Sequence, residues 1–209
     1  MKYFVAGVEL ADLAGEGAQL AGGVVADVAA VMLAAERAGR ASRDLLADLA
    51  RDVGGPVIVD VAPGALEAAR AFAEPGGPVV VRVPFGDEGR AAIRAGVAAG
   101  LRMAALGCTT PALALQAAEA GAAWITAAVG VPTPGPALDE ALTVLRKMVA
   151  LLKTSDAPAQ VLVGPVLDAS TLIDVAFAGA HAAAVPAGLL REIGRPLAAR
   201  DGAGRPVGR

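Results

Sequence analysis

Eight short apolar segments recur along the 209-residue chain, and patterns typical of helices separate them. The segments do not alternate cleanly between apolar and polar residues, which is typical of parallel strands covered on both faces. The expected strands are Tyr3–Gly7, Val24–Val28, Pro56–Val61, Pro78–Pro84, Arg102–Leu106, Ala123–Val129, Gln160–Pro165 and Ala182–Pro186. Eight such units in a chain of this length predict an α/β fold, a single (β/α)₈ TIM barrel.

Helix signals between the strands support this architecture. The expected helices are Asp44–Val53 with Ser42 as cap, Leu66–Ala73, Gly89–Ala99 with Asp87 as cap, a helix from Pro111 capped by Thr110, Leu138–Lys153, Ala169–Phe177 and Leu189–Ile193. An open doubly wound sheet is the alternative, but the first strand–helix turn lacks its G-x-G-x-x-G phosphate fingerprint. We expect residues 1–200 to form the barrel and residues 201–209, rich in glycine, to be a loop or disordered end.

The composition excludes several classes of protein. Apolar residues make up 56% of the chain, and the net charge is −3 with no basic block, so a nucleic-acid partner is not expected. Apolar runs are broken by Gly, Pro or charge before ~18 residues, so no membrane span is expected. The single cysteine, Cys108, excludes an intrachain disulfide and favours a reduced, cytoplasmic setting, with Cys108 as a core residue.

Active sites of (β/α)₈ barrels lie at the carboxyl ends of the strands. Only Asp27, Asp60 and Arg82 are ionisable residues in the later parts of the expected strands, and three consecutive strands supply them. They can form a buried ion pair or triad between strands. Alternatively, Arg82 can clamp an anion or carbonyl group beside a carboxylate acid or base. Both interpretations remain open at this point.

The sequence gives little support for Schiff-base, metal or histidine chemistry. The three lysines, Lys2, Lys147 and Lys153, all lie away from the expected strand ends, so Schiff-base catalysis is not expected. Two carboxylates beside an arginine make a poor metal site, so neither a metal nor another cofactor is expected. The single histidine, His181, precedes the last strand and therefore lies at the end of the barrel opposite to catalysis.

Several segments, in order and at similar spacing, resemble the transaldolase and fructose-6-phosphate aldolase family. They are Met1–Val5, Gly22–Val28, Val81–Pro84 followed by Glu88–Gly89, Ala120–Ile125 and Ala178–Pro186. The resemblance covers about the first 195 residues, and it implies a TIM barrel acting on carbohydrates. It also implies a homo-oligomeric ring, although the family's C-terminal helix is replaced here by the Gly- and Pro-rich tail.

The positions that carry chemistry in this family differ here. Arg82 stands at the Schiff-base lysine, and an arginine cannot replace it because its guanidinium stays protonated. Asp60 matches a polar residue of the third strand. The other replacements are Ala6 for an aspartate, Asp27 for an asparagine, Leu106 for a threonine, Trp124 for a tyrosine, and Val131, Pro165 and Leu167 for residues that bind phosphate in the family.

These replacements lead to three functional hypotheses. The first is a barrel that has lost the aldolase mechanism and is non-catalytic, as a structural, regulatory or partner subunit. The second is an enzyme of changed chemistry on a small anionic carbonyl or sugar-phosphate compound. There, Asp60 or Asp27 would be the catalytic base, and Arg82 and Trp124 would bind the substrate. The third is a working transaldolase or fructose-6-phosphate aldolase.

Overall fold

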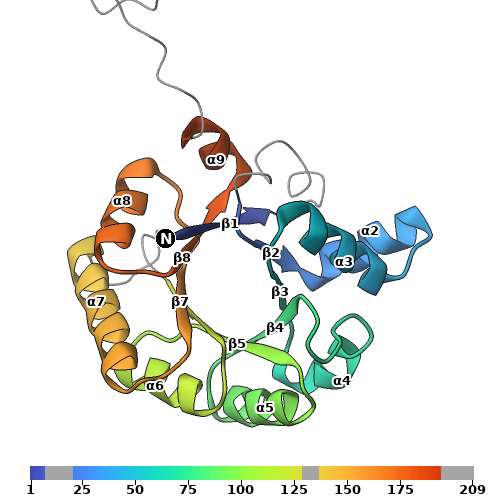
Figure 1. Ribbon diagram of the computed structural model, residues 1–209, viewed down its shortest axis with the longest axis horizontal. Coiled ribbons are helices and arrows are strands. Elements are labelled where there is room, and N and C mark those ends of the chain that lie inside the picture. The colour runs from blue at the N-terminus through green and yellow to red at the C-terminus, as the bar shows by residue number, and fades with distance from the viewer. Residues whose placement is uncertain (8–20, 129–136, 194–209) are drawn as a thin grey trace, which may run out of the picture.

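The computed structural model describes residues 1–7, 21–128 and 137–193. In this part of the chain, strands β1 to β8 follow one another in sequence order around a closed barrel, each parallel to its neighbours, and β8 pairs with β1 (Figure 1). The strands are β1 (Lys2–Gly7), β2 (Val24–Asp27), β3 (Val57–Asp60), β4 (Val79–Pro84), β5 (Arg102–Leu106), β6 (Trp124–Ala127), β7 (Gln160–Val163) and β8 (Ala182–Pro186). The predicted (β/α)₈ TIM barrel is confirmed.

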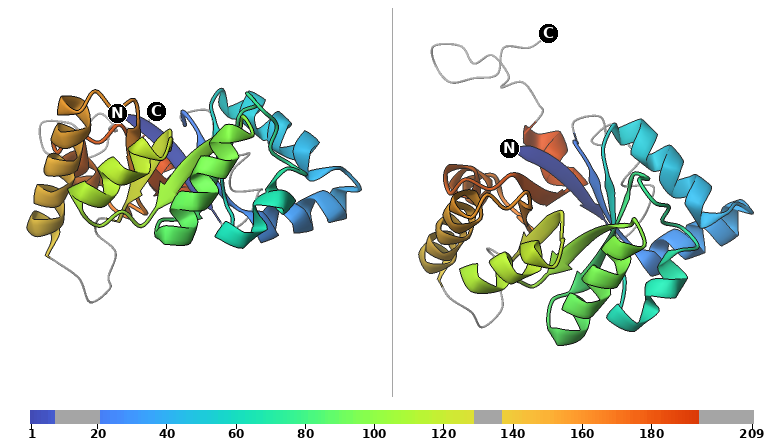
Figure 2. Two further views of the ribbon diagram at one scale, coloured as in Figure 1. Left: turned by 90° about the horizontal axis from the view of Figure 1, so that it is seen from below. Right: turned by 60° about the horizontal axis from the view of Figure 1, so that its bottom comes forward.

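Helices surround the barrel and connect its strands. They are α2 (Val28–Ala38), α3 (Ser42–Val53), α4 (Leu66–Ala69) after a 3₁₀ turn at Pro63–Ala65, α5 (Asp87–Ala98), α6 (Pro111–Glu119), α7 (Leu138–Thr154), α8 (Ala169–Phe177) and α9 (Ala187–Ile193). Figure 1 looks onto the end at which the strands begin, and Figure 2 (left) shows α3 on the same side of the molecule as the N-terminus. Both α2 and α3 lie between β2 and β3 in the sequence.

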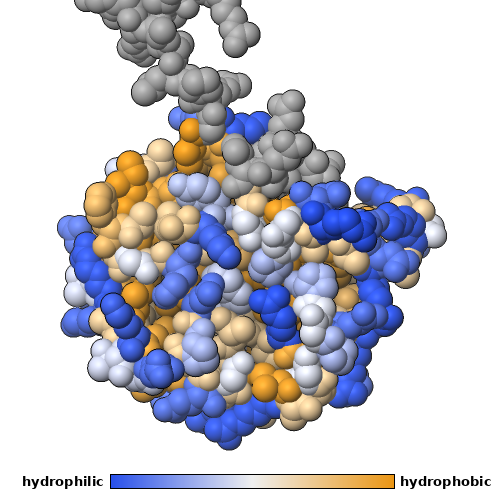
Figure 3. Space-filling model, in the orientation of Figure 1, coloured by the Kyte–Doolittle hydropathy of each residue, from blue (hydrophilic) through white to orange (hydrophobic). Residues whose placement is uncertain are grey.

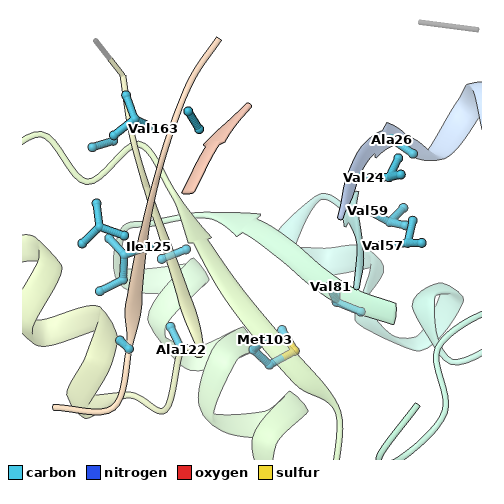
Figure 4. Close-up of a cluster of buried hydrophobic side chains, with 14 of the residues drawn as sticks. Val24, Ala26, Val57, Val59, Val81, Met103, Ala122, Ile125 and Val163 are labelled. Carbon is cyan, nitrogen blue, oxygen red and sulfur yellow. The ribbon is translucent and has the colours of Figure 1, made fainter. Parts of the chain in front are cut away.

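The period of two along each strand divides the core into two layers. Side chains such as Val57, Val59, Val81, Met103 and Ile125 point outward and pack beneath the helices (Figure 4). The intervening residues fill the barrel interior, and they are Phe4, Ile58, Val80, Ala104, Trp124, Leu162, Ala182 and Ala184. The strands are apolar on both faces because both layers exclude water.

The structure corrects several helix predictions. Helix α2 was missed, because residues 28–38 carry no proline or serine at their start, and Asp27 was interpreted as a site residue. The cap positions of α3 and α5 are Ala41 and Gly86, so Ser42 and Asp87 are the first helical residues. The helix expected over Leu66–Ala73 ends at Ala69.

The remaining predicted boundaries agree with the structure, differ from it by a few residues, or fall outside the described residues. Thr110 caps α6 as predicted, because its hydroxyl accepts a hydrogen bond of 3.2 Å from the amide of Leu113. The strand predicted over Gln160–Pro165 ends at Val163. Residue Val129, at the end of a predicted strand, and the predicted tail 201–209 lie outside the described residues.

Candidate functional site

The strands β3 and β4 bring Asp60 and Arg82 together at the carboxyl end of the barrel. The two residues are register partners on adjacent parallel strands. Nε of Arg82 donates to Oδ1 of Asp60 at 2.5 Å, and Nη2 donates to Oδ2 at 2.8 Å, so the pair is bidentate. The Arg82 side chain is 8% exposed, whereas that of Asp60 is 37% exposed. The carboxylate thus covers a nearly buried guanidinium from the side of the solvent.

A third residue, Thr126 on β6, completes the contacts of the guanidinium. Its Oγ1 accepts a hydrogen bond of 3.2 Å from Nη1 of Arg82, and Thr126 is only 3% exposed. Sequence reasoning missed Thr126, because it considered only ionisable residues at strand ends. The sequence could have indicated it, because Thr126 follows Trp124 by two residues and therefore lies on the same face of the strand as this interior residue.

Asp27 lies beside this pair in the sheet but serves a different structural purpose. It is the register partner of Asp60 on β2. Its Oδ1, however, accepts hydrogen bonds of 2.8 and 3.2 Å from the amides of Ala29 and Ala30. Asp27 is therefore the N-cap of α2, and its carboxylate satisfies amide groups that have no partner within the helix. It forms no ion pair with Arg82 within the described residues.

Trp124, the second predicted substrate-binding residue, is part of the barrel interior. It is 4% exposed and meets Phe4 edge to face, with ring centroids 5.1 Å apart and an interplanar angle of 65°. This geometry is the arrangement that aromatic pairs prefer. Because Trp124 lies one layer deeper than Thr126 on the same strand face, its ring packs below the ion pair.

The lysines lie where the sequence placed them. Lys2 begins β1 and is exposed at the N-terminal end, and Lys147 and Lys153 are exposed on α7. These are all the lysines of the chain, and all three are described. The barrel interior therefore contains no amine that could form a Schiff base.

Cys108 and His181 also take the expected places. Cys108 is buried, and its burial raises the pKa of the thiol to about 12, which leaves it protonated and unreactive near neutral pH. His181 precedes β8 at the N-terminal end, where its Nδ1 accepts a hydrogen bond of 3.0 Å from the amide of Val161. Burial, and secondarily the positive charge of the chain's N-terminus, lower the pKa of His181.

Around the ion pair the strand ends are apolar or small. Ala6, Leu106 and Pro186 occupy the ends of β1, β5 and β8, and Leu167, after β7, is exposed. Residue Val131 lies outside the described residues. Among the residues that the structure describes, no cluster of three His, Cys, Asp or Glu side chains could hold a metal ion, and no helix is long and apolar enough to span a membrane. What this site can offer is thus a positive charge, a partly exposed carboxylate and a hydroxyl.

Solved structures support the fold. 3-Hexulose-6-phosphate synthase superposes with a TM-score of 0.60 at 17% identity, covering 92% of this chain and 98% of that one. A putative fructose-1,6-biphosphate aldolase from Coccidioides immitis superposes with a TM-score of 0.63 at 15% identity, covering 91% and 78%. At these identities the similarity concerns the barrel alone.

Sequence relatives are more informative, although no protein-family model matches the chain. A probable transaldolase of Anaeromyxobacter sp. (strain Fw109-5) is 27% identical over 163 residues, which are 76% of this chain and 75% of the relative. A probable transaldolase of Rhodospirillum centenum (strain ATCC 51521 / SW) is 31% identical over 204 residues, which are 92% of this chain and 84% of the relative. Identity at this level over nearly the whole length of both proteins means that the chain belongs to the transaldolase family.

Proposed function

We propose that this protein is a transaldolase-like barrel that has lost the Schiff-base aldolase mechanism and is non-catalytic, as a structural, regulatory or partner subunit. One observation carries the proposal. At the position that resembles the family's lysine, Arg82 is nearly buried and its nitrogens donate to Asp60 and Thr126. A guanidinium held in this way is neither a nucleophile nor free to contact a substrate.

The surroundings of Arg82 support the same proposal. Schiff-base catalysis also needs a group that moves protons, and Ala6 stands where the family resemblance implies an acid/base aspartate. Of the two other candidates, Asp27 caps a helix and Asp60 neutralises Arg82. The amine and the proton-transfer group are therefore replaced together, which points to loss of the reaction rather than to its adjustment.

We also propose that the protein acts as a homo-oligomer in the cytoplasm. Among the exposed large apolar side chains, two helices carry pairs, which are Met32 and Leu33 on α2 and Ile173 and Phe177 on α8. Phe177 is 84% exposed and lies one turn from the exposed Ile173, so the two form a joint apolar patch of the kind that marks interfaces. Light scattering at micromolar concentration tests this, and a monomer would contradict it.

A second candidate function rests on the exposure of Asp60. Because its side chain is 37% exposed, one carboxylate at the barrel mouth remains accessible to a small molecule. An enzyme of changed chemistry on a small anionic carbonyl or sugar-phosphate compound would use Asp60 as base, with Arg82 holding the substrate. This alternative requires Arg82 to exchange some of its internal hydrogen bonds for bonds to the substrate.

The decisive experiment is trapping with borohydride. The protein is incubated with dihydroxyacetone or fructose 6-phosphate and reduced with borohydride, and its mass is measured by mass spectrometry. A catalytically active transaldolase is the positive control. We expect an unchanged mass, because no lysine lies inside the barrel. A reduced adduct on any lysine of the barrel would overturn the proposal and favour a working aldolase.

A ligand screen separates the two remaining hypotheses. Sugar phosphates and small keto acids are tested for an increase in melting temperature, since a ligand that binds the folded state stabilises it by mass action. A non-catalytic barrel predicts no stabilisation that depends on Arg82. A compound that stabilises the protein but not the Arg82→Met variant would instead support the enzyme of changed chemistry.

A further inference from the structure

A groove at the opposite end of the barrel combines two arginines with small side chains. It lies between α3 and the beginnings of the strands and has a volume of about 430 Å³. Its lining consists of Ala47, Ala50 and Arg51 on α3, Gly55 and Pro56 before β3, Pro78 before β4, and Arg102 at the start of β5. Figure 3 shows this end of the molecule, where hydrophilic residues reach into the middle of the face.

Arg102 carries a charge that no described residue neutralises. It shares its strand face with Ala104, which belongs to the barrel interior, so its side chain leaves β5 on the interior-facing side. Arg102 is half-buried, and within the described residues it forms no ion pair with an Asp or Glu. A partly desolvated guanidinium of this kind favours the approach of an anion.

Arg51 faces the same groove with its charge only partly compensated. Its Nη1 donates to Oδ1 of Asp48 at 2.7 Å, and Nε and Nη2 have no hydrogen-bond partner among the described residues. Asp48 is shared, because its Oδ2 also accepts a bond of 2.5 Å from Arg40. One carboxylate thus serves two guanidiniums, with Asp44 as a further negative charge near Arg40, so Arg51 shares the carboxylate that it contacts.

The rest of the lining adds space and no negative charge. Ala47, Ala50 and Gly55 are small, and the prolines contribute no amide hydrogen, so the guanidiniums supply the charged donors of the groove. No Asp or Glu lines the groove. Two guanidiniums around a shallow, otherwise apolar hollow suit a tetrahedral oxyanion, which can accept several charge-assisted hydrogen bonds at once.

We propose that this groove binds a phosphate group through Arg51 and Arg102. The site goes beyond the proposed function, because it uses none of the residues at the mouth of the barrel. It lies at the end where the strands begin, whereas Asp60 and Arg82 lie where they end. A phosphate or phosphate ester bound here would bridge α3 to β5 and stabilise the barrel without competing with a ligand at Arg82.

Titration of the full-length protein tests this site. Inorganic phosphate and glycerol 3-phosphate are added separately, against chloride at matched ionic strength, and binding is followed by amide NMR shifts and calorimetry. We expect saturable binding that perturbs the amide of Gly55. Equal affinities would identify the phosphate group alone as the ligand, and tighter binding of glycerol 3-phosphate would identify a phosphorylated metabolite. Responses no larger than those to chloride would overturn the proposal.

Matched variants assign the binding to the groove. Arg102→Gln and Arg51→Gln should each weaken binding by about tenfold or more, because each removes a charged donor. Arg51 is 73% exposed, so its variant is expected to fold even if Arg102→Gln does not. Arg146→Gln, on the exposed face of α7, is the control and should bind like the parent. Unchanged binding by the Arg51 variant would overturn the assignment. The Arg82→Met variant should bind phosphate like the parent, because the groove uses no residue at the mouth of the barrel.

Discussion

Asp60 and Arg82 form a bidentate ion pair across two neighbouring strands, and the two side chains differ greatly in their exposure to water. The guanidinium is 8% exposed and the carboxylate 37%. The unpaired charge that remains after one partner is removed therefore lies in a very different environment in the two cases. A carboxylate without its arginine can be hydrated at the barrel mouth, whereas a guanidinium without its carboxylate stays in the interior and cannot lose its proton.

This asymmetry predicts the order of two single variants. Asp60→Leu should lower the free energy of unfolding by about 3–5 kcal/mol, because it leaves a buried charge unpaired. Arg82→Met should cost less, about 1–3 kcal/mol, because it sacrifices hydrogen bonds but leaves a carboxylate that water can reach. Urea unfolding of both variants measures the difference. A larger loss for Arg82→Met than for Asp60→Leu would contradict the burial seen here.

The double variant tests whether the pair is a structural unit. Arg82→Met combined with Asp60→Leu should be more stable than Asp60→Leu alone, because no buried charge remains. The coupling free energy from the complete double-mutant cycle should be well above about 0.5 kcal/mol, the usual limit of additivity for distant sites. Additive losses would show that the two side chains do not depend on each other in solution.

Asp27 allows its two interpretations to be separated. As the cap of α2, Asp27→Ala should cost about 1 kcal/mol of stability, and Asp27→Ser should recover most of this loss because a serine hydroxyl can accept the same amide hydrogen bonds. Thermal melts measure both variants. If Asp27 were instead a catalytic base, Asp27→Ser would keep the stability yet abolish any turnover found in a substrate screen.

The position of His181 at the N-terminal end of the barrel predicts that the free energy of unfolding depends on pH. Its Nδ1 accepts a hydrogen bond from the amide of Val161, so only the form with a deprotonated Nδ1 fits. Burial and the nearby N-terminal charge lower the pKa of His181 in the folded state, so below about pH 6.5 the unfolded chain binds the proton more readily. This contribution to stability is complete above about pH 6.5 and is lost as the pH falls toward the folded pKa.

Melting temperatures between about pH 5 and 8 measure this contribution. His181→Leu cannot titrate, so the difference between the parent and the variant should change with pH only below about pH 6.5. Carboxylates that titrate at the acid end affect both proteins alike and cancel in this difference. A constant difference across the range would mean that the proton of His181 is not linked to folding.

The sequence predicted the barrel because its apolar segments must be buried on both faces, and because eight such units without the phosphate fingerprint of an open doubly wound sheet favour closure. It also singled out Asp60 and Arg82 as the charges at the ends of adjacent buried strands, but it left open whether they form an ion pair or bind a ligand. Asp27 was misinterpreted because a carboxylate at a strand end resembles a site residue until the following helix is known. Thr126 was missed because an uncharged β-branched residue is also an ordinary strand residue.

The ion pair has a consequence for how the sheet closes. Side chains alternate between the two faces of a strand, so a slip of one residue between β3 and β4 would turn Arg82 outward beneath the helices. There it would displace the apolar contacts of Val81 and Val83 and lose both Asp60 and Thr126. Valine-rich strands carry little information of their own about alignment, since neighbouring valines are interchangeable. In this barrel, the paired charges of Asp60 and Arg82 therefore select one alignment of the strands over its near neighbours.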